Sequence, residues 1–261
     1  MNNFEVLIEN LDLKLFEKIP SQSTEFDKQS LLAVQNAVRE LKSDYNYLEI
    51  GSYLGGSIQP YLLDDKCAKI YSVDKRPPVQ PDARGIDYAY QNNTTARMIE
   101  KLKEVAPDKM NKLTTIDGDT AKISASQVAD KIELCFIDGE HTDEAVLRDF
   151  KFCYEVLAVN GAIAFHDSQI TYNGIADSLK FLDSKSIKYN AYILPNIVFV
   201  VEIGDFPIHK NPKILERLIN NHPSYLFSLQ NNDEFRRFAN RFPFRQLRNL
   251  LVRARKGHIS Q

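Results

Sequence analysis

The sequence predicts an α/β fold, in which a mostly parallel seven-stranded sheet carries helices on both faces. Three observations predict it. Short apolar segments alternate with helical patterns over residues 46–184, as in parallel sheets that are buried on both sides. The first apolar segment ends in a glycine-rich turn. The last two strand candidates are separated only by Pro195-Asn196, which is too short for a parallel crossover and predicts an antiparallel hairpin.

The elements follow in order along the chain. Residues 1–45 have a helical pattern, including Leu31, Val34 and Val38 on one stripe. Strands are expected at Tyr47–Ile50, Lys69–Val73, Leu113–Ile116, Glu133–Ile137, Ala162–Phe165, Tyr189–Leu194 and Ile197–Glu202. Helices are expected at Gly56–Leu63, Thr94–Val105, Ser124–Ala129, Thr142–Leu157 and Ile175–Ser184. This predicts a doubly wound, Rossmann-like domain over 46–204, preceded by a helical cap over 1–45 and followed by a helical extension over 205–261.

The composition limits the class of protein and the cellular compartment that we expect. A chain of 261 residues with 43% hydrophobic content can bury one sizeable core. Cys67, Cys135 and Cys153 show no CxxC spacing, which favours a reducing compartment over a disulfide framework or a zinc site. No apolar run approaches the roughly 20 residues that span a bilayer, and Glu5 and Glu9 stand where a signal peptide would be basic. We therefore expect a cytoplasmic protein.

The net charge of −2 hides an asymmetric distribution. The stretch from Arg236 to Gln261 has eight Lys or Arg residues and no acids, which leaves a balance of −10 over residues 1–235. Over 241–253 arginines interleave with Phe and Leu, which predicts a basic amphipathic helix. Docking on the acidic domain or on a second subunit, contact with an anionic membrane surface, and binding of a phosphorylated substrate all stay open for it. Nucleic-acid binding is not expected, since no such module is present.

The glycine turn predicts a cofactor crevice. The segment from Leu48 to Ser57 reads Leu-Glu-Ile-Gly-Ser-Tyr-Leu-Gly-Gly-Ser, and Gly51 there can adopt backbone angles closed to other residues at the end of a first parallel strand. The spacing departs from G-x-G-x-x-G, and the P-loop Lys is missing, which disfavours a nicotinamide oxidoreductase. Glu49, just before the turn, suits a cationic ligand. S-adenosylmethionine, with its amino group and sulfonium centre, is such a ligand.

Two further strand ends carry acids that suit a nucleoside. The second strand ends at Asp74, where a carboxylate can accept both hydroxyls of a ribose. The third ends in a turn with Asp119 and Thr120, a place for the adenine edge. A single Asp at a strand end is more often a cap or turn residue, but acids at three neighbouring strand ends favour a binding edge.

The fourth and fifth strand ends predict the chemistry. Asp138 follows a buried strand directly and His141 comes three residues later, while the next strand ends in His166-Asp167. The charges of Asp138 and Asp167 directly after apolar strand residues are costly unless they are paired or coordinated. By contrast, His141 could be a solvated loop residue, and His166 could only hydrogen-bond to the backbone. The carboxylates suit a hard cation such as Mg²⁺, which lowers the pKa of a bound hydroxyl. A neutral His can then accept the proton.

These motifs together resemble the class I S-adenosylmethionine-dependent methyltransferases over about residues 45–204. Within that class the chain is similar to the cation-dependent O-methyltransferases of the catechol, caffeoyl-coenzyme A and sugar or macrolide-glycoside types. The resemblance implies that Gly51, Tyr53 and Ser57 of the glycine loop line the methionine part of the cofactor. Ser52 and Gly55 of the same loop are also expected to bind the cofactor. It places Asp74 at the ribose.

For the reactive centre, the resemblance implies an Asp138 ligand with a His141 base three residues on, and a second metal ligand at His166-Asp167. The catechol branch has Asp-Asn at that last position and the macrolide-sugar branch has Glu-Asp. The His166 of this chain is a poorer ligand for Mg²⁺ and a better one for transition metals.

The predicted function is methyl transfer from S-adenosylmethionine to a hydroxyl of a sugar or other small polyol, assisted by a divalent cation. The alternatives are a metal-independent methyltransferase acting on an amine or a carboxylate, and a non-catalytic cofactor-binding protein. No readable code in the sequence identifies the acceptor. Its specificity is expected from residues 1–45, the loop Arg76–Tyr90, the loop Ser168–Gly174 and the tail.

Overall fold

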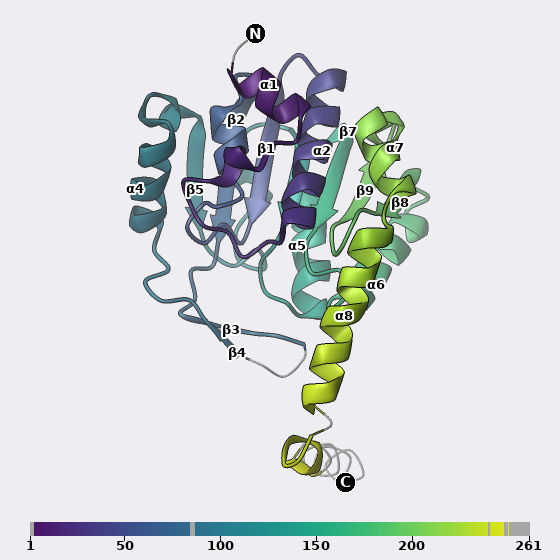
Figure 1. The fold of residues 1–261 in the computed structure, drawn as a ribbon. Helices are drawn as coiled ribbons and strands as arrows, with labels where there is room; N and C mark the ends of the chain where they lie inside the picture. Colours follow the sequence, from purple (N-terminus) through teal and green to yellow (C-terminus); the bar gives the residue numbers. More distant parts are fainter. Residues whose placement is uncertain (1–2, 84–86, 240, 248–249, 251–261) are drawn as a thin grey trace. The chain divides into compact units, whose positions relative to one another are not determined.

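The centre of the computed structural model is a seven-stranded sheet in the order β5-β2-β1-β6-β7-β9-β8 (Figure 1). Its strands are β1 (Tyr45–Ile50), β2 (Cys67–Asp74), β5 (Leu113–Asp117), β6 (Ile132–Ile137), β7 (Leu157–Phe165), β8 (Tyr189–Ile193) and β9 (Phe199–Ile203). The first five run parallel, whereas β9 is antiparallel to both β7 and β8 and lies between them. The predicted fold class and the terminal hairpin are confirmed.

Helices cover both faces of this sheet (Figure 1). They are α1 (Asn3–Glu9), α2 (Glu25–Leu41), α3 (Gln59–Leu63), α4 (Thr95–Val105), α5 (Asp143–Val156), α6 (Tyr172–Ser184) and α7 (Pro212–Ile219), with short 3₁₀ turns η1 (Leu13–Phe16), η2 (Pro107–Lys112), η3 (Ala125–Gln127) and η4 (Ile208–Lys210). The helix predicted over Ser124–Ala129 is wrong, because only the three-residue η3 forms there. The Ser124 side chain accepts the Ser126 backbone N–H, a local bond that competes with a continuing helix.

Alternation along the strands explains the two-sided core. Tyr47 and Phe136 belong to one buried cluster, together with residues of α2, α3 and α4. Leu48 and Cys135, one position away on the same strands, belong to a second cluster with residues of α5 and α6. Successive strand side chains point to opposite faces, so neighbouring apolar residues on one strand, such as Tyr47 and Leu48, bury both faces of the sheet.

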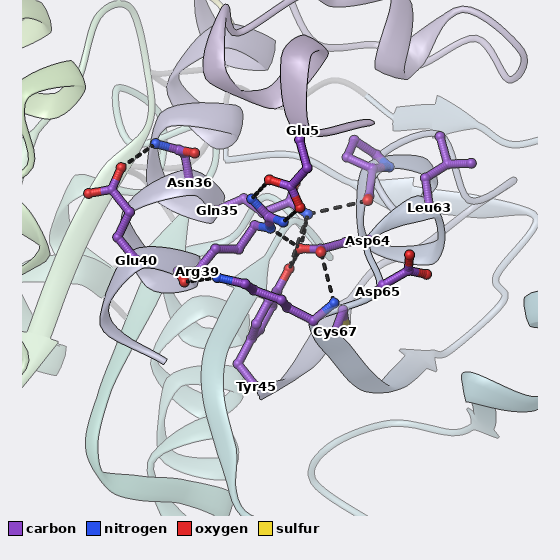
Figure 2. A network of polar contacts seen from close by, with 12 residues as sticks. Glu5, Gln35, Asn36, Arg39, Glu40, Tyr45, Leu63, Asp64, Asp65 and Cys67 are labelled. Atoms are coloured by element: carbon purple, nitrogen blue, oxygen red, sulfur yellow. Dashed lines mark hydrogen bonds and ion pairs between the residues drawn. The ribbon is translucent and has the colours of Figure 1, made fainter. Parts of the chain in front are cut away.

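A buried polar network ties the N-terminal helices to the sheet (Figure 2). The Arg39 guanidinium of α2 lies 2.7 Å from an Asp64 carboxylate oxygen, and both side chains are buried. Its other end pairs with Glu5 of α1 at 2.5 Å. Asp64 also accepts the Tyr45 hydroxyl of β1 at 2.8 Å. Because each charged group has partners, the cost of burying it is offset.

The region Arg76–Tyr90 contains a hairpin that the sequence analysis did not predict. Strands β3 (Val79–Pro81) and β4 (Asp87–Ala89) pair antiparallel. Figure 1 shows them beyond the end of the sheet toward which the arrow of β1 points. This is the edge at which the predicted site residues lie.

The structure describes all residues except 1–2, 84–86, 240, 248–249 and 251–261. The chain divides into two compact units, Met1–Ile219 and Asn220–Gln261. The second contains α8 (His222–Ala239). Of the predicted basic amphipathic helix over 241–253, residues 248–249 and 251–253 lie outside the described residues. The predicted domain boundaries at 45/46 and 204/205 stay predictions. Among the helices that are described, none combines the length and apolar character needed to cross a bilayer.

Candidate active site

The glycine turn brings three strand ends together. The Gly51 N–H donates to the Val73 carbonyl of β2 at 2.9 Å, and the Asp138 N–H donates to the Ile50 carbonyl of β1 at 2.9 Å. Gly51 has φ of +90°, a conformation that favours glycine. A Cβ at this position would collide with the carbonyl group of Asp138. Only glycine therefore allows the ends of β1 and β6 to approach this closely.

A cleft of about 400 Å³ opens above this turn. It is lined by residues from the N-terminal segment, the glycine turn, the β3–β4 hairpin and the ends of β2, β6 and β7. Of the residues predicted from the sequence, the lining includes Gly51, Ser52, Tyr53, Ser57, Asp74, Asp138, His141, His166 and Asp167. Residues far apart in sequence thus share one cavity, as expected where parallel strands end.

The predicted residue Glu49 lies beneath the cleft and not in its lining. Its carboxylate is fully buried and accepts the Tyr47 hydroxyl at 2.6 Å and the Ser57 hydroxyl at 2.7 Å. Burial raises the pKa of Glu49 to about 7, against the lowering effect of the two hydroxyl donors. In this arrangement Glu49 orients Ser57, which does line the cleft.

Asp119 and Thr120 line a smaller adjoining cavity, which shares Gly51 and Asp74 with the main cleft. The Arg148 side chain donates to the Thr120 hydroxyl at 3.0 Å and lies 3.3 Å from Asp119. The two cavities together follow the sheet edge from β6 to β5. Gly55, another predicted residue, is absent from the lining of both and packs against Leu102.

Asp74 anchors the loops around the cleft. One carboxylate oxygen accepts the Tyr53 N–H at 2.9 Å, and the other accepts the Arg76 N–H at 2.7 Å. The Arg76 guanidinium lies 3.3 Å away. The predicted ribose acid is therefore held rigidly beside the glycine turn.

Asp138, His141 and Asp167 form an acid–imidazole cluster. One ligand atom of each lies within 4.8 Å of those of the other two, and His141 Nε2 is 3.1 Å from Asp167 Oδ2. Two carboxylates with one imidazole can serve as ligands for a divalent cation. The residues present therefore fit a metal ion.

His166 contacts the same carboxylates from a more buried position. Its Nδ1 lies 2.9 Å from Asp167 and 3.2 Å from Asp138, and its Nε2 lies 3.6 Å from Asp27. Burial by itself lowers the pKa of His166, but the charge of Asp138 and the bonds to Asp138, Asp167 and Asp27 raise it well above its usual value. An imidazolium between these carboxylates can hold them in place, and the predicted role of His166 as a metal ligand stays a prediction. Among the described residues, the three whose ligand atoms lie close enough together to hold one ion are Asp138, His141 and Asp167.

Several lining residues were not predicted from the sequence. Asp27 is N3 in the capping box of α2, and it also faces His166. Tyr88 and Tyr90 line the cleft from β4 and the residue just after it. The alternation in Asp87-Tyr-Ala-Tyr90 is a strand signal that could have revealed the tyrosines. Nothing in the local sequence distinguishes Asp27 from an ordinary helix cap.

Comparisons with known proteins agree with this geometry. Residues 48–168 match a family model described as a methyltransferase domain. The structure of the O-methyltransferase NovP superposes with a TM-score of 0.55 at 12% identity, over 76% of this chain and 97% of NovP. The apo structure of CalS11, a TDP-rhamnose 3'-O-methyltransferase in calicheamicin biosynthesis, gives a TM-score of 0.51 at 15% identity, over 77% of this chain and 94% of CalS11. No curated protein matches the chain.

At these identities the structural likeness establishes a shared fold, and the family model adds the similarity of residues 48–168 to a methyltransferase domain. The model covers the glycine turn, Asp74, Asp138, His141 and the end of β7. Residues 48–168 therefore match a methyltransferase domain, within a fold that this chain shares with O-methyltransferases.

Proposed function

We propose that this protein transfers a methyl group from S-adenosylmethionine to a hydroxyl of a sugar or other small polyol, with a divalent cation assisting. The observation that carries the proposal is the position of the acid–imidazole cluster. Asp138, His141 and Asp167 line the same cleft as the glycine turn. A donor held by the turn and an acceptor held by the cluster would be neighbours.

The cleft has the features that the donor requires. Gly51 lets the ends of β1 and β6 approach each other at the base of the cleft, Glu49 fixes the Ser57 hydroxyl, and Asp74 contributes a carboxylate to the lining. When bound, S-adenosylmethionine supplies a methyl group already activated on a sulfonium. The chain's share is to hold donor and acceptor in line, which removes much of the entropic barrier.

Asp138 and Asp167 would hold the cation, with His141 beside them. A bound divalent cation lowers the pKa of a coordinated hydroxyl. His166, between the two carboxylates and Asp27, keeps them oriented. His141 Nε2, which faces Asp167, is placed to accept the proton that the acceptor hydroxyl loses.

The walls of the cleft support a polyhydroxylated acceptor. Beside the cluster they present Gln22, Ser23, Gln80, Tyr88 and Tyr90. Hydroxyl and amide groups can bond several hydroxyls of one molecule, and tyrosine adds an apolar ring with a polar tip. CalS11, which shares the fold, is a TDP-rhamnose 3'-O-methyltransferase, and TDP-rhamnose is a nucleotide sugar.

The proposal is tested by methyl transfer from tritium-labelled S-adenosylmethionine to a panel of nucleotide sugars and glycosides, with amines and carboxylates as competing acceptors. We expect label on a hydroxyl, loss of transfer in EDTA and its return with Mg²⁺ or Mn²⁺. H141A should lose about 10²–10⁴-fold in turnover while keeping its affinity for S-adenosylhomocysteine.

His222→Ala is the matched control, since His222 is exposed at the start of α8. It should retain full turnover. Full activity in EDTA would show that methyl transfer requires no divalent cation. Transfer to amines or carboxylates alone would favour the metal-independent alternative, and unchanged turnover in H141A would exclude His141 as the base.

A further inference from the structure

The β3–β4 hairpin and the loop after β6 join at a point next to the acid–imidazole cluster. Asp82, just after β3, forms an isolated parallel bridge with His141. The Ala83 N–H donates to the His141 carbonyl at 2.8 Å. The backbone of the hairpin is thus held against the backbone of the residue that the proposed reaction uses as its base.

The side chains meet at the same point. Asp82 Oδ2 lies 3.3 Å from His141 Nδ1, and His141 Nε2 lies 3.1 Å from Asp167 Oδ2. The ring of His141 therefore stands between two carboxylates. In a neutral imidazole, one nitrogen donates and the other accepts, so only one of these carboxylates can receive an N–H.

Burial decides which carboxylate receives it. The Asp82 side chain is 0% exposed and the Asp167 side chain is 15% exposed. A nitrogen lone pair that faces a carboxylate oxygen is repelled by it, and this repulsion is stronger in the buried surroundings of Asp82 than at the open cleft, where water screens it. Asp167, at the open cleft, can draw on water or a bound ligand.

We propose that Asp82 is a positioning residue that holds His141 as the Nδ1–H tautomer, with the Nε2 lone pair directed at the Asp138–Asp167 side of the cleft. The arrangement is the one by which a carboxylate orients a catalytic or metal-bound imidazole through its far nitrogen. Either use of His141, as a base or as a cation ligand, needs a free lone pair on Nε2. The catalytic consequence rests on the proposed function, but the tautomer itself does not.

The test is the protonation state of the two ring nitrogens of His141, read from long-range ¹H–¹⁵N correlations of ¹⁵N-histidine-labelled full-length protein. The sample contains EDTA and no cofactor and is kept at pH 8.5. The chain has five His, so the spectrum of H141Q assigns the signal. We expect a proton on Nδ1 and none on Nε2. A proton on Nε2 in the wild-type protein, with or without one on Nδ1, overturns the proposal.

Asp82→Asn should then convert the single tautomer into a mixture, because an amide can donate as well as accept. Asp87→Asn is the matched control, as Asp87 lies in the same hairpin and is exposed. It should give the wild-type spectrum. A D82N spectrum identical to wild type also overturns the proposal. The wild-type measurement keeps the test decisive if D82N does not fold.

Turnover provides a second, separate readout. With an acceptor found by the labelling experiment, D82N should lower kcat about 10–100-fold, the usual cost of removing such an orienting partner, with KM for S-adenosylmethionine unchanged. The NMR result needs neither donor nor acceptor. Failure of methyl transfer would therefore leave the tautomer intact, and a wrong tautomer would leave the methylation proposal standing.

Discussion

At the scale of single residues, Glu49 shows how a buried carboxylate can serve a site that it does not line. Its oxygens accept the hydroxyls of Tyr47 and Ser57, so Ser57 is fixed from below. Burying the charged carboxylate costs free energy, and this burial raises the pKa of Glu49 to about 7. An ordinary Glu, as in the unfolded chain, titrates near 4.5.

This shift predicts a pH dependence of stability that E49Q removes. Between about pH 4.5 and 7 the folded state binds more protons at Glu49 than the unfolded state does, so the free energy of unfolding falls as pH rises through this window. As pH rises through this window, the free energy of unfolding of the wild type should fall on the order of 3 kcal/mol more than that of E49Q. Urea unfolding of both proteins at pH 5 and pH 8 measures it. Equal pH slopes in the two proteins would contradict the assignment.

At the scale of elements, α2 connects two separate polar centres. Its first turn brings Asp27 to His166 at the site, and its last turn brings Arg39 to Asp64 and Glu5 (Figure 2). Asp27 also accepts the Asn196 amide from the β8–β9 turn at 3.0 Å. The helix thus fixes the N-terminal segment to the sheet at both ends.

The buried ion pair predicts a large effect of R39A. Removing the guanidinium leaves the buried Asp64 carboxylate without its cation, which typically costs 3–5 kcal/mol. The free energy of unfolding from urea titration checks this. Lys28→Ala, a cation elsewhere on α2, should change it by less than about 0.5 kcal/mol. A loss below about 1 kcal/mol in R39A would show that the network contributes little.

Some elements could be predicted from the sequence and others could not. Strands such as β1 and β6 are apolar at successive positions and end in Glu49–Gly51 or Asp138, so their type and the edge that they share could be predicted. The β3–β4 hairpin could not, since its strands have three residues each and begin in a proline-rich loop. Asp82 reaches His141 only through that hairpin. Its role depends on a contact 59 residues away in sequence, which no local pattern encodes.

At the scale of the whole molecule, the residues proposed to hold the donor, the cation and the base line one cleft of the unit Met1–Ile219. The cleft draws on segments from residue 21 to residue 197, so it exists only when the sheet and the N-terminal segment fold together. The described part of the second unit exposes Tyr225, Leu226, Phe242 and Leu250, and the predicted uses of its basic stretch stay predictions.

The most direct test of the central claim is calorimetric titration of the full chain with S-adenosylhomocysteine and, separately, with NAD. We predict one S-adenosylhomocysteine per chain and no binding of NAD. Asp74→Asn should weaken the affinity about tenfold or more, as expected for the loss of a charged hydrogen bond, and the exposed control Asp108→Asn should not. No heat with S-adenosylhomocysteine, or equal binding in D74N and wild type, would contradict a cofactor cleft at the glycine turn.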